Sequence, residues 1–438
     1  MMGWLLGLLP VVTLAVTVPF HQSGFQPGPG GLPEGWRTWA ARTEIAPRTY
    51  VDEIRSRGQP GSLAVSGASN AAAYGGWERV VEGIAPGAWY RLTAWYAAEG
   101  LSYEPGQVVA RLDWRDPKGR RAGQPDYAFR TEVHGAWRRL TLEAPAPPET
   151  AAVAIQLFLA HAPLATIWWD EISLEAIPAP PPREVTVAAL KYRPSGSASA
   201  AENVERFIET IEKAVPGRVD LILLGEGITV VGTGKKYSDV AEPVPGPTTA
   251  RLGQYARRRN AWIVAGLYER EPPAIYNTAV LLDRQGRLAG KYRKVYLPRE
   301  EIEGGLRPGD AYPVFQTDFG TVGIMICWDL HYADPARHLA IKGAELILLP
   351  IWGGNEALPK ARAIENHVFL AASGYDHATY ILDPEGRTLA SAPARGQAAI
   401  ATLDLNRRYV DKWLGWMRGR FMKELRLDLA APRPGFEP

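Results

Sequence analysis

The chain has 438 residues, of which 46% are apolar and 22% are charged, and its formal net charge is +2. This composition is typical of a globular protein with about two or three domains. The balanced charge excludes a strong electrostatic preference for nucleic acid or for an acidic membrane surface. A single cysteine excludes an intramolecular disulfide and a cysteine-rich zinc site.

The first 20 residues contain no charged side chain and form one apolar run. A run of this length is typical of a secretory signal peptide and is near the lower limit for a membrane-spanning helix. No basic residue precedes the run, and no clean A-x-A cleavage site follows it. A cleaved signal peptide, a retained N-terminal anchor and a buried segment therefore all stay open. The first two predict an exported protein, secreted or periplasmic, or tethered to a membrane.

Two segments rich in glycine and proline predict linkers, at residues 21–35 and 176–184. Between them, residues 36–175 contain short runs that alternate apolar and polar residues and are separated by turn clusters. This pattern predicts an antiparallel β-sandwich. The order of the runs, GAWRRLTLEAPAPPETAAVAIQLFLA followed by IWWDEISLE, resembles the jelly-roll domains of galactose-binding-like proteins and carbohydrate-binding modules.

The sandwich region is rich in tryptophan, which suggests two different uses. Exposed indole rings would form a platform for a glycan or polymer, whereas buried rings would only fill the core, leaving the domain as a spacer or packing element. Trp168 and Trp169 alternate within one predicted strand, so one of them is expected in the core. The candidates for a platform are Trp36, Trp77, Trp89, Trp95, Trp114 and Trp137.

The pattern changes at residue 185. Continuous apolar strands such as VDLILLGE and AELILLPIW follow, with amphipathic helical segments such as ASAAENVERFIETIEKAV between some of them. Strands of this kind are covered on both faces, so residues 185–410 are predicted to form a layered α/β domain. Residues 411–438 are left as a C-terminal tail.

Three strand ends of this domain stop at reactive side chains, namely Glu226, Lys294 and Cys327. Taken singly, each is more often a cap, surface or core residue. Together they meet a chemical requirement, because a thiol with a pKa of about 8.5 needs a base or a positive neighbour to act as a nucleophile. Attack on an amide also creates an oxyanion that needs a hydrogen-bond donor. Glutamate, lysine and cysteine supply these roles without histidine.

The same residues lie in blocks that resemble the nitrilase superfamily of carbon–nitrogen hydrolases. The blocks occur in order as DLILLGEG, NTAVLLDRQGRLAGKYRKVYLP, GTVGIMICWDLHYADPAR and ARAIENHVFLAAS. The resemblance covers residues 185 to about 405. It implies a four-layer αββα fold that commonly forms dimers. It also implies Glu226 as general base, Lys294 as stabiliser of the tetrahedral intermediate, and Cys327 as the nucleophile that forms a thioester.

The resemblance implies two further contributions to the site. The backbone N–H of Trp328 would be a second oxyanion donor. A glutamate after the lysine often orients substrate or water in these enzymes, and Glu303 best fits the spacing to the following Pro-Gly, with Glu301 as the alternative. Residues that follow the cysteine or the next strand end are predicted to line the substrate pocket: Trp328, His331, Tyr332, Trp352 and Asn355.

Other residues of the blocks are predicted to be structural: Tyr276, Asn277, Arg293, Arg362, Glu365 and Asn366. The chain also departs from the family pattern. Gly225 stands where proline is common, and Tyr296 stands where histidine is common. Residues 332–334 replace a frequent F-P-E. These changes leave the three reactive groups in place and affect the expected shape of the pocket.

These observations predict a hydrolase of linear amides or N-carbamoyl amides, because Cys-Trp-Asp resembles the amidase-like branches more than the Cys-Trp-Glu of true nitrilases. Nitrile hydrolysis and acyl transfer to an amine by the same triad are alternatives. A non-catalytic extracellular binding protein is another, although it predicts the loss of a triad residue.

The sequence also bears on cofactors and partners. The seven histidines form no metal-binding spacing, and there is no phosphate-binding glycine motif, so neither metal nor cofactor is predicted. The predicted partners are a small amide substrate, a glycan or polymer for the sandwich, and further copies of the chain in a homodimer or higher homo-oligomer. Nucleic acid is not among them.

Overall fold

The computed structural model describes residues 20–429 and divides the chain into two compact units. One unit combines the residues up to Pro180 with those from Val410 onward, and the other spans Pro181–Tyr409. The predicted signal peptide or anchor lies outside the described residues, except for Phe20. Among residues 20–429, no helix is both long and apolar enough to cross a membrane.

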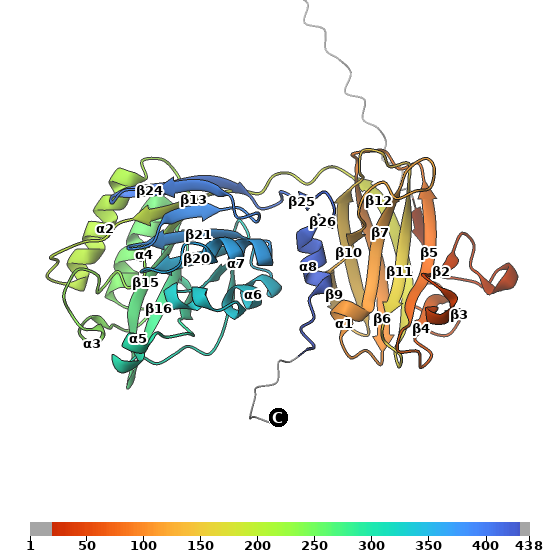
Figure 1. Cartoon of the computed structure of the whole chain (residues 1–438), viewed down its shortest axis with the longest axis horizontal. Coiled ribbons are helices and arrows are strands. Elements are labelled where there is room, and N and C mark those ends of the chain that lie inside the picture. The colour runs from red at the N-terminus through yellow and green to blue at the C-terminus, as the bar shows by residue number, and fades with distance from the viewer. Residues whose placement is uncertain (1–19, 430–438) are drawn as a thin grey trace, which may run out of the picture. The chain divides into compact units, whose positions relative to one another are not determined.

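The first unit contains two antiparallel sheets (Figure 1). One has the order β3-β4-β12-β6-β10-β9, with β1 paired to β12, and the other has the order β2-β5-β11-β7-β8. The strands are β1 (Phe20–Gln22), β2 (Arg37–Ala40), β3 (Arg48–Asp52), β4 (Ser62–Ser66), β5 (Tyr74–Glu82), β6 (Trp89–Glu99), β7 (Val108–Arg115), β8 (Asp126–Tyr127), β9 (Arg130–His134), β10 (Trp137–Pro145), β11 (Ala152–Ala160) and β12 (Thr166–Ile177). Short helices are η1 (Pro29–Gly31), η2 (Thr43–Ile45) and α1 (Glu104–Gln107).

Alternation along the strands builds the core between the two sheets. In β11, the apolar side chains of Val153, Ile155, Leu157 and Leu159 all enter this core, as a period of two requires. Trp169 lies in the same core whereas Trp168 lies outside it, as their alternation predicts. Three candidates for an exposed platform, Trp36, Trp77 and Trp114, are instead buried in this core, so that part of the platform prediction is wrong.

The segment predicted as an N-terminal linker is packed at its start. Strand β1 pairs with β12, and Phe25 is fully buried in the sandwich core. The indole N–H of Trp36 donates to Oε1 of Gln22 at 3.0 Å. The linker prediction for residues 21–35 therefore fails over its first residues, because β1 pairs with β12 and Phe25 buries its ring in the core.

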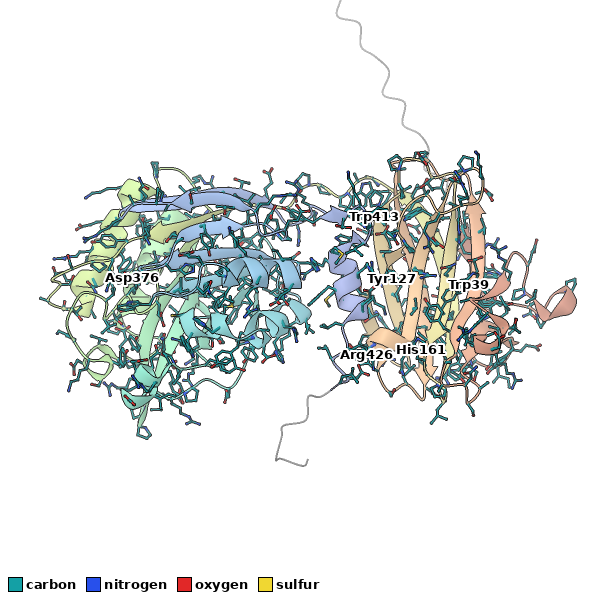
Figure 2. All side chains as sticks on the ribbon, viewed as in Figure 1. Trp39, Tyr127, His161, Asp376, Trp413 and Arg426 are labelled. Carbon is teal, nitrogen blue, oxygen red and sulfur yellow. The ribbon has the colours of Figure 1, made fainter. Side chains whose placement is uncertain are left out.

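The C-terminal tail also belongs to the sandwich unit. It forms a hairpin of β25 (Val410–Asp411) and β26 (Gly415–Trp416), followed by α8 (Met417–Glu424). The ring of Trp416 lies 5.6 Å from that of Phe129, and Lys423 Nζ donates to the carbonyl of Val108 at 2.7 Å. Figure 2 labels Trp413, which is 82% exposed between the two hairpin strands. The tail is thus a late part of the first unit.

The second unit contains two six-stranded sheets. The first, in the order β17-β16-β15-β14-β13-β24, consists of β13 (Glu184–Lys191), β14 (Leu221–Leu223), β15 (Trp262–Glu271), β16 (Ala274–Leu282), β17 (Leu288–Arg293) and β24 (Gln397–Asp404). The second runs in chain order and consists of β18 (Val314–Gln316), β19 (Thr321–Ile324), β20 (Leu346–Ile351), β21 (Phe369–Gly374), β22 (Thr379–Leu382) and β23 (Thr388–Ala392). The strands β13, β14 and β15 are parallel, as are β19, β20 and β21.

Helices cover the outer faces of both sheets, which gives the predicted order αββα (Figure 1). On the first sheet lie α2 (Ala200–Ala214) and α4 (Pro247–Arg259), and on the second lie α6 (Asp334–Ile341) and α7 (Leu358–Asn366). Short helices are α3 (Tyr237–Val240), α5 (Arg299–Glu303) and the 3-10 helix η3 (Cys327–His331). Helix α2 shows why such segments form: Ser199 caps its N-terminus, and Val204, Phe207, Ile208 and Ile211 make one buried stripe.

Candidate active site

Three charged side chains from separate segments of the second unit meet in one buried cluster. Glu226 follows β14, Lys294 follows β17, and Glu301 lies on α5; all three are almost completely buried. Lys294 Nζ lies 2.9 Å from Oε1 of Glu226 and 3.0 Å from Oε1 of Glu301. One buried ammonium thus faces two carboxylates, an arrangement that is costly without close pairing and therefore typical of functional sites.

Asn277 joins the same cluster from β16. Its Nδ2 donates to Oε1 of Glu226 and to Oε1 of Glu301, both at 2.7 Å. Its backbone carbonyl accepts the N–H of Lys294 at 2.9 Å. The prediction that Asn277 is structural is thus incomplete, because its amide fixes both carboxylates. The available signal was a polar residue inside the apolar strand NTAVLL.

The backbone around Glu226 explains why glycine stands at position 225. A Cβ on Gly225 would lie 2.8 Å from the ring of Tyr375, and one on Gly266 would lie 2.7 Å from Cα of Glu226. The Tyr375 hydroxyl donates to the carbonyl of Glu226 at 2.7 Å. Tyr375 therefore holds the glutamate loop in place, a role that no motif in the sequence indicated.

Cys327 is the first residue of η3 and adopts a left-handed conformation, with φ of 42°. A non-glycine residue pays about 1–3 kcal/mol for such a backbone, and strain of this kind persists where the surroundings impose it. The thiol Sγ lies 3.6 Å from the carbonyl oxygen of Gly353, which follows β20. The sharp turn presents a half-buried cysteine at the carboxyl ends of the parallel strands.

The thiol shares its electrostatic environment with the charged cluster. Burial and, to a smaller extent, the charge of Glu226 raise the pKa of Cys327 against the opposing effect of Lys294, and the net result is about 12. Backbone hydrogen bonds from Trp352 and Gly353 also favour the thiolate. The resting cysteine is therefore protonated at neutral pH, so a nucleophilic reaction requires a base.

The pKa values of Lys294 and Glu301 are both raised, for different reasons. Burial disfavours the Lys294 ammonium, but the charges of Glu226, Cys327 and Glu301 outweigh this and raise its pKa. Burial and the negative charge of Glu226 raise the pKa of Glu301, Lys294 lowers it, and the net result is about 7. Lys294 thus stays charged at neutral pH, whereas Glu301 changes its protonation state near neutral pH.

Glu303, predicted as the fourth active-site carboxylate, is not in the cluster. Its side chain is 70% exposed and lies 3.8 Å from Arg299, whereas the side chain of Glu301 is 6% exposed beside Lys294. Residues two apart on a helix point away from each other, so only one of the two can face the site. The prediction of Glu303 is therefore corrected to Glu301, the alternative.

Four of the five predicted pocket residues lie on or next to the segments that carry and contact the thiol. Trp328 and His331 share the cysteine turn, and their rings lie 4.2 Å apart. Tyr332 follows that turn and stacks on Tyr296, with ring centres 3.8 Å apart. Trp352 directly precedes Gly353. Trp328 and His331 thus belong to the cysteine turn, Tyr332 directly follows it, and Trp352 precedes the glycine whose carbonyl contacts the thiol.

Asn355 has a different use. Its exposed side chain accepts the N–H of Ala357 at 2.9 Å and so helps to start α7. This bond gives no support to its prediction as a pocket residue.

Arg362 supports the cysteine turn from α7, as the structural prediction for this block suggests. Its Nε and a terminal nitrogen donate to the carbonyl of Leu330 at 3.2 and 3.0 Å. Arg293 instead pairs with Glu269, at 2.7 Å, and links β17 to β15 across the intervening strand β16. Within residues 20–429, no group of three or more histidine, cysteine, aspartate or glutamate side chains has a metal-binding arrangement.

A four-layer αββα domain that brings a glutamate, a lysine and a cysteine together defines the class of carbon–nitrogen hydrolases. The sequence model described as carbon-nitrogen hydrolase matches residues 186–413, just over half of the chain. The chain belongs to this family and is an amidase-like hydrolase.

Similar proteins carry amidase names. Omega-amidase NIT2 of Xenopus tropicalis is 28% identical over 235 residues, which cover 47% of this chain and 84% of the relative. The human omega-amidase NIT2 is 27% identical over 240 residues, covering 48% and 86%.

Among solved structures, Nit3 of Saccharomyces cerevisiae has 23% identity, covers 50% of this chain and 90% of its own, and has a TM-score of 0.47. An amidase from Nesterenkonia sp. has 22% identity, covers 51% and 93%, and has a TM-score of 0.44.

Proposed function

We propose that the chain hydrolyses a small linear amide or N-carbamoyl amide through a thioester on Cys327. The observation that carries this proposal is the asymmetric environment of Glu226. Its Oε1 is held by Lys294 and Asn277, while its Oε2 has no hydrogen-bond partner among the described residues. A buried carboxylate oxygen without a partner beside a protonated thiol is suited to accept a proton.

The first half of the reaction forms the thioester. Oε2 of Glu226 takes the proton from the Cys327 thiol as sulfur attacks the substrate carbonyl carbon. The carbonyl oxygen becomes negatively charged, and Lys294 stabilises it together with the N–H of Trp328. The intermediate then collapses, the carbon–nitrogen bond breaks, and the leaving nitrogen takes the proton from Glu226. Ammonia or an amine departs, and the acyl group stays on sulfur.

The second half releases the acid. Glu226, ionised again, removes a proton from water, and the resulting hydroxide attacks the thioester carbon. Lys294 stabilises the second oxyanion, and collapse breaks the carbon–sulfur bond. The proton returns from Glu226 to sulfur, which restores the resting thiol. A permanently charged lysine suits both oxyanions, and the raised pKa of Lys294 is consistent with this role.

The relatives support an amide in preference to a nitrile. Two of these relatives, from Xenopus tropicalis and from human, are named omega-amidase, a name that denotes amide hydrolysis by those proteins. Nitrile hydrolysis and acyl transfer to an amine would use the same first step, and the products distinguish them.

The test is incubation with a panel of simple amides, N-carbamoyl amides and nitriles, with ammonia and acid measured and the intact mass followed. Wild-type protein should release ammonia and show a transient increase in mass by one acyl group. Cys327→Ala should show neither, and Glu226→Gln should reduce acylation on the order of 100-fold or more without loss of the folded state. Unchanged turnover by Cys327→Ala would exclude the thioester route.

The proposals about location and partners rest mainly on the sequence. Export is proposed from the uncharged apolar run over residues 1–20. The homodimer and the glycan ligand of the sandwich stay predictions, as does its resemblance to galactose-binding-like domains. On the outer face of the sheet that contains β2, β11 and β8, Trp39 and Tyr127 are only partly buried (Figure 2), and they are better candidates for sugar contact than the core tryptophans.

A further inference from the structure

Asp329, the third residue of Cys-Trp-Asp, is fully buried and accepts three hydrogen bonds. Its Oδ1 accepts the backbone N–H of Tyr296 at 2.9 Å. Its Oδ2 accepts the backbone N–H of Ile326 at 2.9 Å and the phenolic O–H of Tyr292 at 2.8 Å. All three partners are donors, so the side chain is matched to an ionised carboxylate.

The donors lie on both sides of the proposed chemistry. Tyr292 and Tyr296 are the second residues before and after Lys294, and Ile326 directly precedes Cys327. The lysine segment leaves the sheet that contains β17, whereas the cysteine turn follows β19 in the other sheet. One carboxylate therefore ties together the two segments that carry the lysine and the thiol.

Asp329 also holds the strained turn itself. Its own N–H donates to the carbonyl of Ile326 at 3.0 Å while its Oδ2 accepts the N–H of the same residue. This reciprocal pair closes a ring around Cys327, whose φ is 42°. A left-handed cysteine persists only where its neighbours impose the conformation, and Asp329 is such a neighbour.

We infer that Asp329 is a positioning residue, which sets the place of the Cys327 thiol relative to the Lys294 ammonium. The inference deepens the proposed function and rests on it. It assigns the aspartate of Cys-Trp-Asp to the framework of the site, and it makes side-chain length decisive. A glutamate would carry its carboxylate one methylene further and could not meet all three donors without moving the lysine segment or the turn. An asparagine would point an amide N–H₂ toward a donor.

The test compares Asp329→Asn and Asp329→Glu with a matched control, Asp383→Asn. Asp383 is also a buried aspartate that accepts backbone N–H groups, from Glu385 and Arg387, in the turn between β22 and β23. Two readouts are measured for each folded variant: the rate of Cys327 alkylation by iodoacetamide without any substrate, and kcat and KM on the best amide of the panel.

Both Asp329 variants should alkylate at least about 10-fold more slowly than wild type and lose about 100-fold in kcat, with KM changed less than about 3-fold. Asp383→Asn should keep both rates within about 2-fold of wild type, whatever it costs in stability. Equal alkylation rates in Asp329→Asn and wild type would overturn the inference. So would losses no greater than those of Asp383→Asn.

Tyr292→Phe keeps the inference testable if the Asp329 variants do not fold. It removes one of the three donors and leaves the ring in place, and it should slow alkylation about 3-fold to 10-fold with KM unchanged. Wild-type alkylation by this variant would contradict the positioning role. The two proposals fail separately: alkylation that depends on Asp329 without any amide turnover would sink the hydrolase, whereas turnover that needs Cys327 but not Asp329 would sink the positioning role alone.

Discussion

Replacing Glu301 by glutamine should make the stability of the α/β unit less dependent on pH between about pH 5 and pH 8, and it should impair the site. The pKa of Glu301 is raised from 4.5 to about 7, chiefly by burial. A group whose folded-state pKa is raised contributes stability below its unfolded pKa and loses it as pH rises through the folded value. Glu301 should therefore destabilise the wild-type fold progressively between about pH 5 and pH 8.

The size of this effect follows from the two pKa values. A rise from 4.5 to about 7 corresponds to roughly 3 kcal/mol of unfolding free energy, of which about 2–3 kcal/mol is lost between about pH 5 and pH 8.5. Glu301→Gln removes the ionisation, so the change in stability across this pH range should shrink by that amount. Any cost of burying the new amide is the same at both pH values and cancels in the difference.

The assay is unfolding of wild type and variant by guanidinium at about pH 5 and about pH 8.5, followed by tryptophan fluorescence. Glu303→Gln is the matched control, because its exposed carboxylate should contribute less than about 0.5 kcal/mol at either pH. A pH dependence in Glu301→Gln as steep as that of wild type would refute the reasoning, and so would an equal flattening in Glu303→Gln.

Two other changes test the local geometry. Gly225→Ala should lower amidase activity at least about 10-fold, because the new methyl group would meet the ring of Tyr375, which holds the glutamate loop. Gly217→Ala is the control in the same kinetic assay and should be neutral, because a Cβ at Gly217 meets open space. Ending the chain at Tyr409 should lower the unfolding free energy of the sandwich unit by roughly 2 kcal/mol and its calorimetric melting temperature by about 5 °C or more. Trp413→Ser, at an exposed position, should leave the melting temperature unchanged. An unaltered melting temperature in the truncated chain would show that the tail does not stabilise the unit.

The sequence by itself determined the class of both units and the three reactive residues of the second. Alternating runs indicated strands with one buried face, and continuous apolar runs indicated strands covered on both faces, because side-chain periodicity is a local property of the chain. Glu226 and Cys327 follow the parallel strands β14 and β19, whose carboxyl ends are where ligands bind, and Lys294 follows the antiparallel edge strand β17. Their family resemblance is carried by contiguous blocks and needs no three-dimensional information.

Tertiary structure decided which neighbours complete the site. Glu301 and Glu303 are both glutamates on the same short helix, and only the orientation of α5 decides that Glu301, and not Glu303, faces Lys294. Asn277 and Tyr375 reach Glu226 across 51 and 149 positions of the chain, so no local pattern identifies them. These contacts depend on how separate strands and helices pack.

The same limit applies to chain segments rich in glycine, proline or charge. Residues 21–35 are predicted as a linker from their glycine and proline content, which does not reveal that Phe25 is buried in the sandwich core. The tail from Val410 onward belongs to the sandwich unit only because the chain returns to that unit. Asp329 is the clearest case. The sequence placed it two residues after the cysteine. Its three hydrogen-bond donors lie in the segments around the ends of β17 and β19, which belong to different sheets. Only the packing of these segments makes Asp329 part of the framework, because hydrogen-bond partners are set by position in space.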